Sequence, residues 1–417
     1  MQNNEFITPW ANKREADSLH SLCSYLGAYP PSLANYFIRY FSDEGDLVFD
    51  PFSGRGTTLL EARLLKRKAI ASDLNPIALA LSKAKSKFLE LPKILNRIDE
   101  LEADYDYALY LPEANAQTEE IHLIFHPRTL AQLCYLRYSL LESKNSIDEL
   151  LIGTVLGIMH GGERKDGTSG YLSISMPNTF SMSPEYVRRF VQTKQLNREF
   201  RDVFKILKEK IIRTYEKHSA PKNEGEVYKA DIKELSLHSQ IKKLNNKIDL
   251  ILTSPPYLGV VNYARQNWIR SWFLNENPEK VSDILDDDLG LFEWMKFSKI
   301  FVTELKKLLK KNGVAIFVIG DVQKSKNSVI PLAREFSQMV KENKFFKNVW
   351  VFSDYIQKID KTTRIWGETS GKATATDRIV ILSDSNPFID NNRLNGESEL
   401  TYELIQESTK FFLGNTP

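Results

Sequence analysis

The sequence predicts an α/β protein with a doubly wound, mostly parallel, Rossmann-like sheet that is interrupted by an inserted, largely helical domain. Residues 47–49 form a short apolar strand that runs into a glycine-rich turn and an apolar helix, as at the start of a nucleotide-binding βαβ unit. From residue 226 onward strand and helix patterns alternate again. The segment 314–319 is almost continuously apolar, as expected when helices cover both faces of a sheet. Residues 85–225, in between, have mainly helical periodicity.

Each element follows from local patterning. The expected elements are a helix at 32–41, strands at 47–49 and 68–72, a helix from Pro76, strands at 227–230 and 248–252, a helix at 294–308 ended by Gly313, and strands at 314–319, 349–351 and 378–382. We therefore predict four parts. Residues 1–84 begin the cofactor-binding domain, 85–225 are the helical insertion, 226–385 complete the catalytic domain, and 386–417 form a helical tail.

Composition narrows the class of protein. The chain has 417 residues, of which 42% are hydrophobic and 26% charged, which is ordinary for a globular protein. The net charge is only +2, so any basic surface for nucleic acid must be local. Cys23 and Cys134 form neither a disulfide framework nor a metal-ligand pattern, and we expect no metal. No signal peptide or membrane-spanning stretch is evident, so we expect a soluble cytoplasmic protein that does not bind a membrane.

The most informative motif follows the strand at 248–252 and consists of Thr253, Ser254, Pro255, Pro256 and Tyr257. In open α/β sheets, the carboxyl ends of the strands are where ligands bind. The prolines cannot donate to a β-ladder, so we expect their carbonyls to accept from a ligand. The serine hydroxyl adds an acceptor and the tyrosine adds a flat ring, a combination that suits a planar heterocycle with an exocyclic amine. The alternative is a proline turn that merely ends the strand.

A second motif is the glycine turn after the first strand. Gly54 and Gly56 allow a close approach of ligand to backbone. Asp73 ends the next strand, where a carboxylate can accept from both ribose hydroxyls of an adenosine, and Asp231 ends the third, where it would meet the adenine. Singly, each aspartate is more often a cap or turn residue. Leu59 occupies the place of a third glycine, and there is no Walker lysine, so adenosine with a non-phosphate tail fits better than a dinucleotide.

Together the segments 50–57 and 253–257 resemble the amino-methylating DNA methyltransferases, which use S-adenosylmethionine. The resemblance covers about residues 1–90 and 226–385. The segment 26–30 is similar to a further cofactor motif of that family. By resemblance, the cofactor-binding residues are Tyr29, Asp50, Phe52, Ser53, Gly54, Gly56, Thr57, Asp73, Asp231 and Thr253. No membrane or metal partner is implied.

The resemblance also assigns the chemistry. Ser254, Pro255, Pro256 and Tyr257 are the implied catalytic residues, and a motif that begins with serine is typical of enzymes that methylate the N4 amine of cytosine. Motifs that begin with aspartate or asparagine favour the N6 amine of adenine, which is the alternative here. RNA-base and protein-glutamine methyltransferases, and a catalytically silent nucleic-acid-binding module, are further alternatives. We expect base flipping and direct methyl transfer, without the cysteine nucleophile of ring-carbon methyltransferases.

Target recognition is expected in the insertion, because it separates the glycine turn from the catalytic motif. The candidate phosphate contacts are Arg164, Lys165, Arg188, Arg189, Arg265 and Arg270, although each set also fits a solvated charged face. Tyr263, Trp268 and Trp272 lie among these arginines, either in a DNA-facing loop or in a helix that packs its tryptophans inward. Residues 364–372 are a second candidate segment. The expected partner is DNA, and the protein would act either alone or as the modifying half of a pair with a cognate restriction endonuclease.

Overall fold

The computed structural model describes residues 16–143, 145–177, 183–219, 221, 223–258, 263, 265–325, 328–355 and 373–387. Its centre is an eight-stranded sheet in the order β3-β2-β1-β4-β5-β8-β7, and β6 pairs with β5 outside this path. The pairs from β3 to β5 are parallel, whereas β8 is antiparallel to both β5 and β7. The strands are β1 (Leu47–Asp50), β2 (Lys68–Asp73), β3 (Gly225–Lys229), β4 (Ile248–Thr253), β5 (Leu309–Ser325), β6 (Ser328–Ile330), β7 (Asn348–Tyr355) and β8 (Ala373–Ser383).

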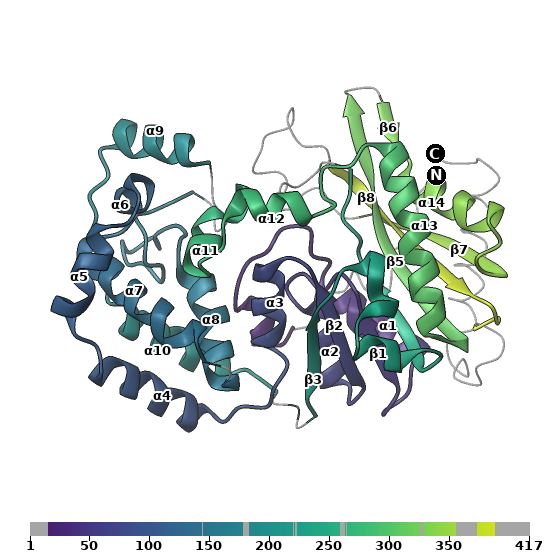
Figure 1. Cartoon of the computed structure of the whole chain (residues 1–417), viewed down its shortest axis with the longest axis horizontal. Coiled ribbons are helices and arrows are strands. Elements are labelled where there is room, and N and C mark those ends of the chain that lie inside the picture. Colours follow the sequence, from purple (N-terminus) through teal and green to yellow (C-terminus); the bar gives the residue numbers. More distant parts are fainter. Residues whose placement is uncertain are drawn as a thin grey trace, which may run out of the picture.

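Helices cover both faces of the sheet (Figure 1). On one face α1 (Pro31–Phe41) and α2 (Thr57–Leu64) pack on alternate residues of the strands, such as Ile316 of β5. On the other face α13 (Leu291–Leu308) and α14 (Leu332–Glu342) pack on the residues between them, such as Phe317. Because successive side chains of a strand point to opposite faces, the near-continuous apolar run of β5 serves both layers. The doubly wound α/β fold expected from the sequence is therefore present.

A largely helical region lies beside the β3 edge of the sheet (Figure 1). Its helices are α4 (Leu91–Ala103), α5 (Tyr107–Asn115), α6 (Glu119–Ile124), α7 (Pro127–Leu141), α8 (Ser146–Ile158), α9 (Pro184–Lys194) and α10 (Val203–Tyr215). Their apolar side chains form one cluster with Leu60 of α2 and Ile77 of α3 (Pro76–Lys83). The insertion therefore shares its core with the helices that cover the sheet.

Shorter elements complete the chain. They are η1 (Ser18–Ser21), η2 (Ile232–Leu237), η3 (Ile241–Leu244), η4 (Arg265–Asn267), α11 (Trp268–Phe273) and α12 (Pro278–Ile284). The segments η4, α11 and α12 follow the motif at 253–257 and lead back toward the helical region (Figure 1).

One sequence-based boundary was wrong. We expected Gly313 to end the helix at 294–308, but α13 ends at Leu308 and Gly313 lies inside β5. The pairing of β4 with β5 shifts register between Ile248 and Leu250, so the residues before Val314 form a bulge. A Cβ at Gly313 would lie 3.0 Å from the carbonyl oxygen of Ile248. The glycine therefore serves a close backbone approach in a strand and not a helix end.

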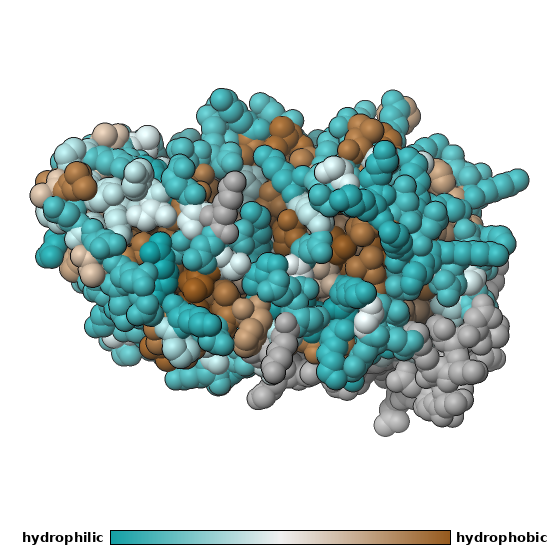
Figure 2. Space-filling view, turned by 60° about the horizontal axis from the view of Figure 1, so that its bottom comes forward, coloured by the Kyte–Doolittle hydropathy of each residue, from teal (hydrophilic) through white to brown (hydrophobic). Residues whose placement is uncertain are grey.

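The predicted helical tail falls mainly outside the described residues, as does the candidate segment 364–372. Within the described residues, no helix is both long and apolar enough to cross a bilayer. Figure 2 shows one face of the molecule as mainly hydrophilic, with apolar residues in several separate groups.

Candidate functional site

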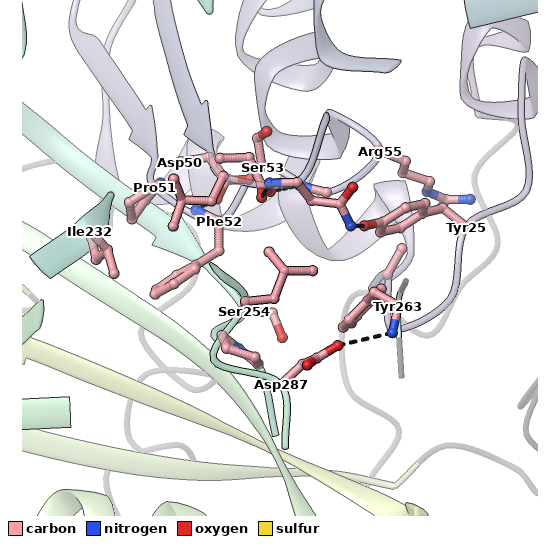
Figure 3. A pocket seen from close by; sticks show the side chains of 18 of the residues that line it. Tyr25, Asp50, Pro51, Phe52, Ser53, Arg55, Ile232, Ser254, Tyr263 and Asp287 are labelled. Atoms are coloured by element: carbon pink, nitrogen blue, oxygen red, sulfur yellow. Dashed lines mark hydrogen bonds between the residues drawn. The ribbon is translucent and has the colours of Figure 1, made fainter. Parts of the chain in front are cut away.

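A cleft lies at the carboxyl ends of β1, β2 and β4, where the two sequence motifs come together (Figure 3). It encloses about 840 Å³ of space, its open mouth included. The walls include the glycine turn after β1, Asp73 at the end of β2 and Ser254 after β4. Parallel strands thus bring residues that are distant in sequence to one sheet edge.

The glycine turn is held in place by the next strand. Gly54 and Gly56 have φ angles of 49° and 75°, in the left-handed region that suits glycine. The N–H of Gly54 donates to Oδ2 of Asp73 at 3.0 Å. A Cβ at Gly56 would lie 3.1 Å from Cα of Ser82 in α3. Both glycines are therefore needed, one for the contact with Asp73 and the other for the close packing of α3.

Asp73 both holds the glycine turn in place and borders the cleft. Its Oδ1 accepts from the N–H of Asn75 at 2.9 Å, while Oδ2 accepts from Gly54. Burial raises the pKa of Asp73 to about 6, although these backbone donors oppose the shift. A half-buried carboxylate that already orients the glycine turn and borders the cleft is preorganised to accept further hydrogen bonds from a ligand.

Asp50 is the most deeply placed acid of the cleft, with an exposed fraction of 2%. Its Oδ1 accepts from Oγ1 of Thr253 at 2.6 Å and from the N–H of Phe52 at 3.2 Å. The Tyr29 hydroxyl lies 3.4 Å from Oδ2. Burial is the main cause that raises the pKa of Asp50 to about 7, and the nearby charge of Asp73 adds to it. Thr253 therefore fixes Asp50 from behind and ties β4 to β1.

The motif at 253–257, which we predicted to be catalytic, is anchored on β5. The hydroxyl of Ser254 donates to the carbonyl of Val318 at 2.9 Å, and the hydroxyl of Tyr257 donates to the same carbonyl at 3.1 Å. The two hydroxyl oxygens lie 3.1 Å apart. When Ser254 donates to Val318, its oxygen lone pairs remain to accept from a ligand. The serine is thus oriented as an acceptor at the wall of the cleft.

The carbonyl of Pro256 differs from our expectation. It accepts from Nε1 of Trp294 in α13 at 2.7 Å, so one of the two proline carbonyls is already engaged within the protein. Trp294 is fully buried, and an indole N–H in a core requires such an acceptor. The contact fixes the turn after Pro255 against α13. No sequence pattern predicts this hydrogen bond, because Pro256 and Trp294 are far apart in the chain and meet only in the folded structure.

The predicted cofactor residues fall into two groups. Those that line the cleft are Tyr29, Asp50, Phe52, Ser53, Gly54, Thr57 and Asp73. Gly56, Thr253 and Asp231 do not line it. Asp231 caps η2, where its Oδ1 accepts from the N–H of Lys233 at 2.8 Å, whereas its neighbours Ala230 and Ile232 face the cleft. The two neighbours of Asp231 that line the cleft are therefore apolar, and a contact from Asp231 to adenine stays a prediction.

Sequence reasoning missed two residues on the outer wall of the cleft. Tyr25 stacks on Tyr263 with ring centroids 5.5 Å apart. The N–H of Tyr263 donates to Oδ2 of Asp287 at 2.9 Å (Figure 3). Asp287 follows α12 within the run 286–288 of three aspartates. A tyrosine outside the motif at 26–30 and an acidic run before a helix are common surface features, so neither carried a usable signal.

The six candidate phosphate contacts do not share one environment. Arg164, Lys165 and Arg189 are exposed. Arg188 pairs with Glu120 at 2.8 Å and with Glu119 at 3.5 Å. The insertion therefore carries exposed cations, and their contact with DNA stays a prediction.

Arg265 and Arg270 differ sharply in their exposure to solvent. Arg265 is exposed and lies 3.8 Å from Glu185. Arg270 is 1% exposed, and its guanidinium donates to the carbonyl of Leu156 at 3.1 Å and to Oδ1 of Asn267 at 2.7 Å. The expected phosphate contact of Arg270 is wrong for this arrangement, because the side chain is enclosed and joins α11 to α8.

The aromatic residues beside these arginines pack inward. Trp268 belongs to the apolar cluster of the helical region and is 8% exposed. Trp272 packs against the same cluster, and its Nε1 donates to Oε1 of Gln117 at 2.7 Å. Of the two arrangements that the sequence allowed, the helix with inward tryptophans is the one found. Tyr263, in contrast, lines the cleft.

Comparison with known proteins agrees with this geometry. Residues 3–84 match the family model described as DNA methylase. The type II methyltransferase M.BsoBI of Geobacillus stearothermophilus is 24% identical over 311 residues, which cover 69% of this chain and 58% of that protein. The type II methyltransferase M.MvaI of Kocuria varians is 30% identical over 103 residues, or 24% of this chain and 22% of that protein. The matches thus span less than two thirds of either relative.

Among solved structures, the rRNA methyltransferase aviRa from Streptomyces viridochromogenes covers 90% of this chain and 95% of its own at 13% identity, with a TM-score of 0.34. That similarity is too low to carry an argument, and the assignment rests on the sequence matches. Residues 3–84 thus match the DNA methylase family of N6 and N4 enzymes, and the chain has distant sequence similarity to type II methyltransferases over part of their length.

Proposed function

We propose that this protein transfers a methyl group from S-adenosylmethionine to the exocyclic amine of a DNA base, with N4 of cytosine preferred and N6 of adenine as the alternative. The observation that carries the proposal is the position of Ser254. Its hydroxyl is oriented by the carbonyl of Val318 and stands at the wall of the cleft that the glycine turn and Asp73 border.

The charges of the cleft fit the cofactor that the DNA methylase family implies. Four carboxylates line it, Asp50, Asp73, Asp286 and Asp287, and the single cation among its described lining residues is Arg55. In Figure 3 the guanidinium of Arg55 is turned away from Ser254 and Asp287. S-adenosylmethionine carries a sulfonium and an ammonium group, and when bound it supplies an electrophilic methyl group. An acidic cleft favours such cations.

Specific residues would hold each part of the cofactor. Asp73 would accept from the ribose hydroxyls, as carboxylates at the end of a second strand do in nucleotide-binding sheets. Phe52 and Ile232 supply apolar walls for adenine. The turn at Ser53 and Gly54 leaves room for the methionine part close to the backbone. The apolar wall, the carboxylate and the glycine turn would thus hold adenine, ribose and the methionine part, respectively.

The catalytic motif addresses the poor nucleophilicity of an aromatic amine. The lone pair of such an amine is delocalised into the ring. Acceptors at Oγ of Ser254 and at the carbonyl of Pro255 would each take one amine hydrogen, which favours a more tetrahedral nitrogen. Positioning of reactants can contribute about 7–11 kcal/mol to lowering the barrier, and fixed acceptors also stabilise the positive charge that develops on the amine.

A base in a duplex must leave the stack before it reaches this motif, which requires a few kcal/mol. Stacking on an aromatic ring returns about 1–3 kcal/mol per base. Tyr257 is the candidate ring, because its hydroxyl bond to Val318 fixes its orientation next to Ser254. The ring and the acceptors would therefore act on the same base.

The choice among amines rests on resemblance. Serine as the first motif residue favours N4 of cytosine, whereas aspartate or asparagine favours N6 of adenine. RNA-base and protein-glutamine methyltransferases commonly carry asparagine or aspartate there, so Ser254 argues against them. A cognate restriction endonuclease is proposed as a partner because the relatives are named as type II methyltransferases.

DNA contact is proposed for the exposed cations Arg164, Lys165, Arg189 and Arg265, and for Arg188, whose ion pairs with Glu119 and Glu120 would have to yield to a phosphate. Such contacts would position the duplex without reading its sequence.

The test is nucleoside mass spectrometry of DNA from a host that expresses the chain. We expect N4-methylcytosine, and its absence from a matched host that expresses Ser254→Ala. N6-methyladenine in place of it would select the alternative amine. DNA without either nucleoside, together with purified protein that transfers no label from S-adenosylmethionine to any duplex, would contradict the proposal.

A further inference from the structure

A second cavity lies between the helical region and the glycine turn. It encloses about 1020 Å³, its open mouth included. Its walls come from the segment 20–24, the end of α8, the loop that follows α8, and α10. Arg55 of the glycine turn also lines it, so the two cavities share this residue. No sequence motif predicts this cavity, since these segments meet only in the fold.

All charged side chains among the described lining residues of this cavity can carry positive charge. They are Arg55, Arg164, Lys210 and Arg213, with His20 in addition. No described aspartate or glutamate lines it. The buried carboxylate of Glu61 accepts from Nδ2 of Asn35 at 2.7 Å and lies 2.8 Å from Nε2 of His20. The carboxylate of Glu61 therefore already interacts with Asn35 and His20.

The partners of these cations are neutral. Nζ of Lys210 donates to the carbonyl of Ser21 at 2.6 Å. Nε of Arg55 donates to Oγ1 of Thr57 at 3.2 Å. In the part of the chain that the structure describes, neither cation has an ion pair. Lys208, on the same helix as Lys210, contrasts with this, since its Nζ lies 2.6 Å from Asp99 and 2.5 Å from Glu102.

A fully buried lysine increases the positive charge behind the cavity. Nζ of Lys85 donates to the carbonyl of Arg55. Burial lowers the pKa of Lys85 to about 7 and that of Lys210 to about 8, and neighbouring cations contribute to both shifts. Cations that are drawn together without acids are unfavourable in isolation, and a bound anion would relieve their repulsion.

We propose that this cavity binds a phosphate group of a nucleotide. Guanidinium groups bind phosphate oxygens through paired N–H donors, and an ammonium group adds a point charge. Lys210 and Arg213 are three residues apart on α10, which places them on one helix face. Tyr171, Ser21 and Ser24 also line the cavity. An aromatic ring beside cations and hydroxyls suits a nucleotide better than a simple inorganic anion.

The phosphate belongs either to the DNA strand or to a free nucleotide. The cavity itself does not depend on methyl transfer, so the phosphate site and the proposed enzymatic function can fail separately. Only assignment of the phosphate to DNA rests on the proposed function.

The experiment is calorimetry on the full chain with inorganic pyrophosphate as the probe. We expect binding by the wild-type protein and at least about ten-fold weaker binding by Lys210→Gln combined with Arg213→Gln, since charge-assisted bonds to phosphate are lost. Lys208→Gln is the matched control on the same helix and should bind as the wild type does. All three proteins should keep the same affinity for S-adenosylmethionine, which shows that the fold is intact.

A second variant tests the cavity through a residue that does not belong to α10. Arg164→Gln should weaken pyrophosphate binding, whereas Lys165→Gln, which changes the adjacent exposed residue outside the cavity, should not. The proposal is overturned if the wild-type protein does not bind pyrophosphate, or if the combined α10 variant binds it as tightly as Lys208→Gln does.

Competition against bound pyrophosphate then identifies which molecule supplies the phosphate group. Duplex DNA that displaces pyrophosphate from the wild-type protein places a backbone phosphate in the cavity. Displacement by a 5′-mononucleotide but not by duplex DNA assigns the cavity to a free nucleotide. Failure of both to displace pyrophosphate would overturn the assignment to a nucleotide.

Discussion

The cleft at the ends of β1, β2 and β4 and the cavity beside α10 meet at the glycine turn, where Arg55 lines both. Four carboxylates and Arg55 line the cleft, whereas four Lys or Arg side chains, Arg55 among them, line the cavity. Arg55 is turned away from the centre of the cleft (Figure 3). One short turn thus separates an environment that favours a cationic ligand from one that favours an anion.

This contrast shows that a net charge of +2 conceals two strong local fields. Because interactions between charges are less screened in partly buried sites than at the surface, the sign of each lining decides its ligand. The following predictions test the separation, from the largest expected effect to the smallest.

The rate of methyl transfer in the cleft should depend most on Ser254, the residue proposed to accept a hydrogen bond from the reacting amine. Ser254→Ala should lower kcat by about 10²–10³-fold, which is typical for loss of one preorganised hydrogen-bonding group. Single-turnover methylation of duplex DNA measures it. Tyr257→Phe keeps the ring and removes only the hydroxyl bond to Val318, so its loss should be smaller. An equal loss in the two variants would mean that Ser254 acts through Val318 and not on the base.

Cofactor affinity should depend on the carboxylate that ends β2. Asp73→Asn should weaken binding of S-adenosylmethionine by about ten- to a hundred-fold, because hydrogen bonds to a charged group contribute about 1.5–3 kcal/mol each. Calorimetry measures the change. Asp249→Asn is the matched control, since Asp249 accepts from the N–H of Leu47 and does not line the cleft. Unchanged affinity in Asp73→Asn would remove its ribose role.

The same carboxylates predict a pH dependence of cofactor binding. The pKa values of Asp50 and Asp73 in the ligand-free protein are raised to about 7 and about 6, so both groups take up protons as the pH falls through this range. A cationic ligand and its hydroxyl donors favour the ionised carboxylates. Affinity should therefore be highest above pH 7 and fall by up to about ten-fold per pH unit for each proton below the respective pKa. Calorimetry between pH 8 and pH 5 measures it. A flat profile would contradict the prediction.

The shared residue should affect the two cavities differently. Arg55→Gln removes one cation from the basic cavity and should weaken pyrophosphate binding several-fold. It should not weaken binding of S-adenosylmethionine, because the guanidinium is turned away from the centre of the cleft (Figure 3), and the cofactor, with two cationic groups and one carboxylate, carries a net positive charge. Both affinities are measured by calorimetry on the same preparation. A parallel loss in both would show that Arg55 instead shapes the glycine turn through its bond to Thr57.

Much of the sheet and the first cleft could be predicted from local patterns. The strands β1, β2 and β4 are apolar runs that end in polar motifs, and the carboxyl ends of parallel strands must meet at one edge. For this reason local patterns are sufficient to identify Asp73 and Ser254 as candidate site residues, whereas Asp50 was named through the family resemblance. The register of β5 could not be predicted, because Gly313 fits a helix end as well as a bulge, and only the carbonyl of Ile248 opposite it distinguishes them.

The sequence by itself determined which strands carry the motifs, the position of the glycine turn and the acceptor after β4, since each depends on neighbours in the chain. Tertiary structure alone decided that Arg270 is buried, that Trp294 takes the carbonyl of Pro256, and that Arg55, Lys210 and Arg213 converge. Those outcomes depend on contacts between segments far apart in sequence. A side chain's charge or ring is encoded locally, but what it faces is set by packing.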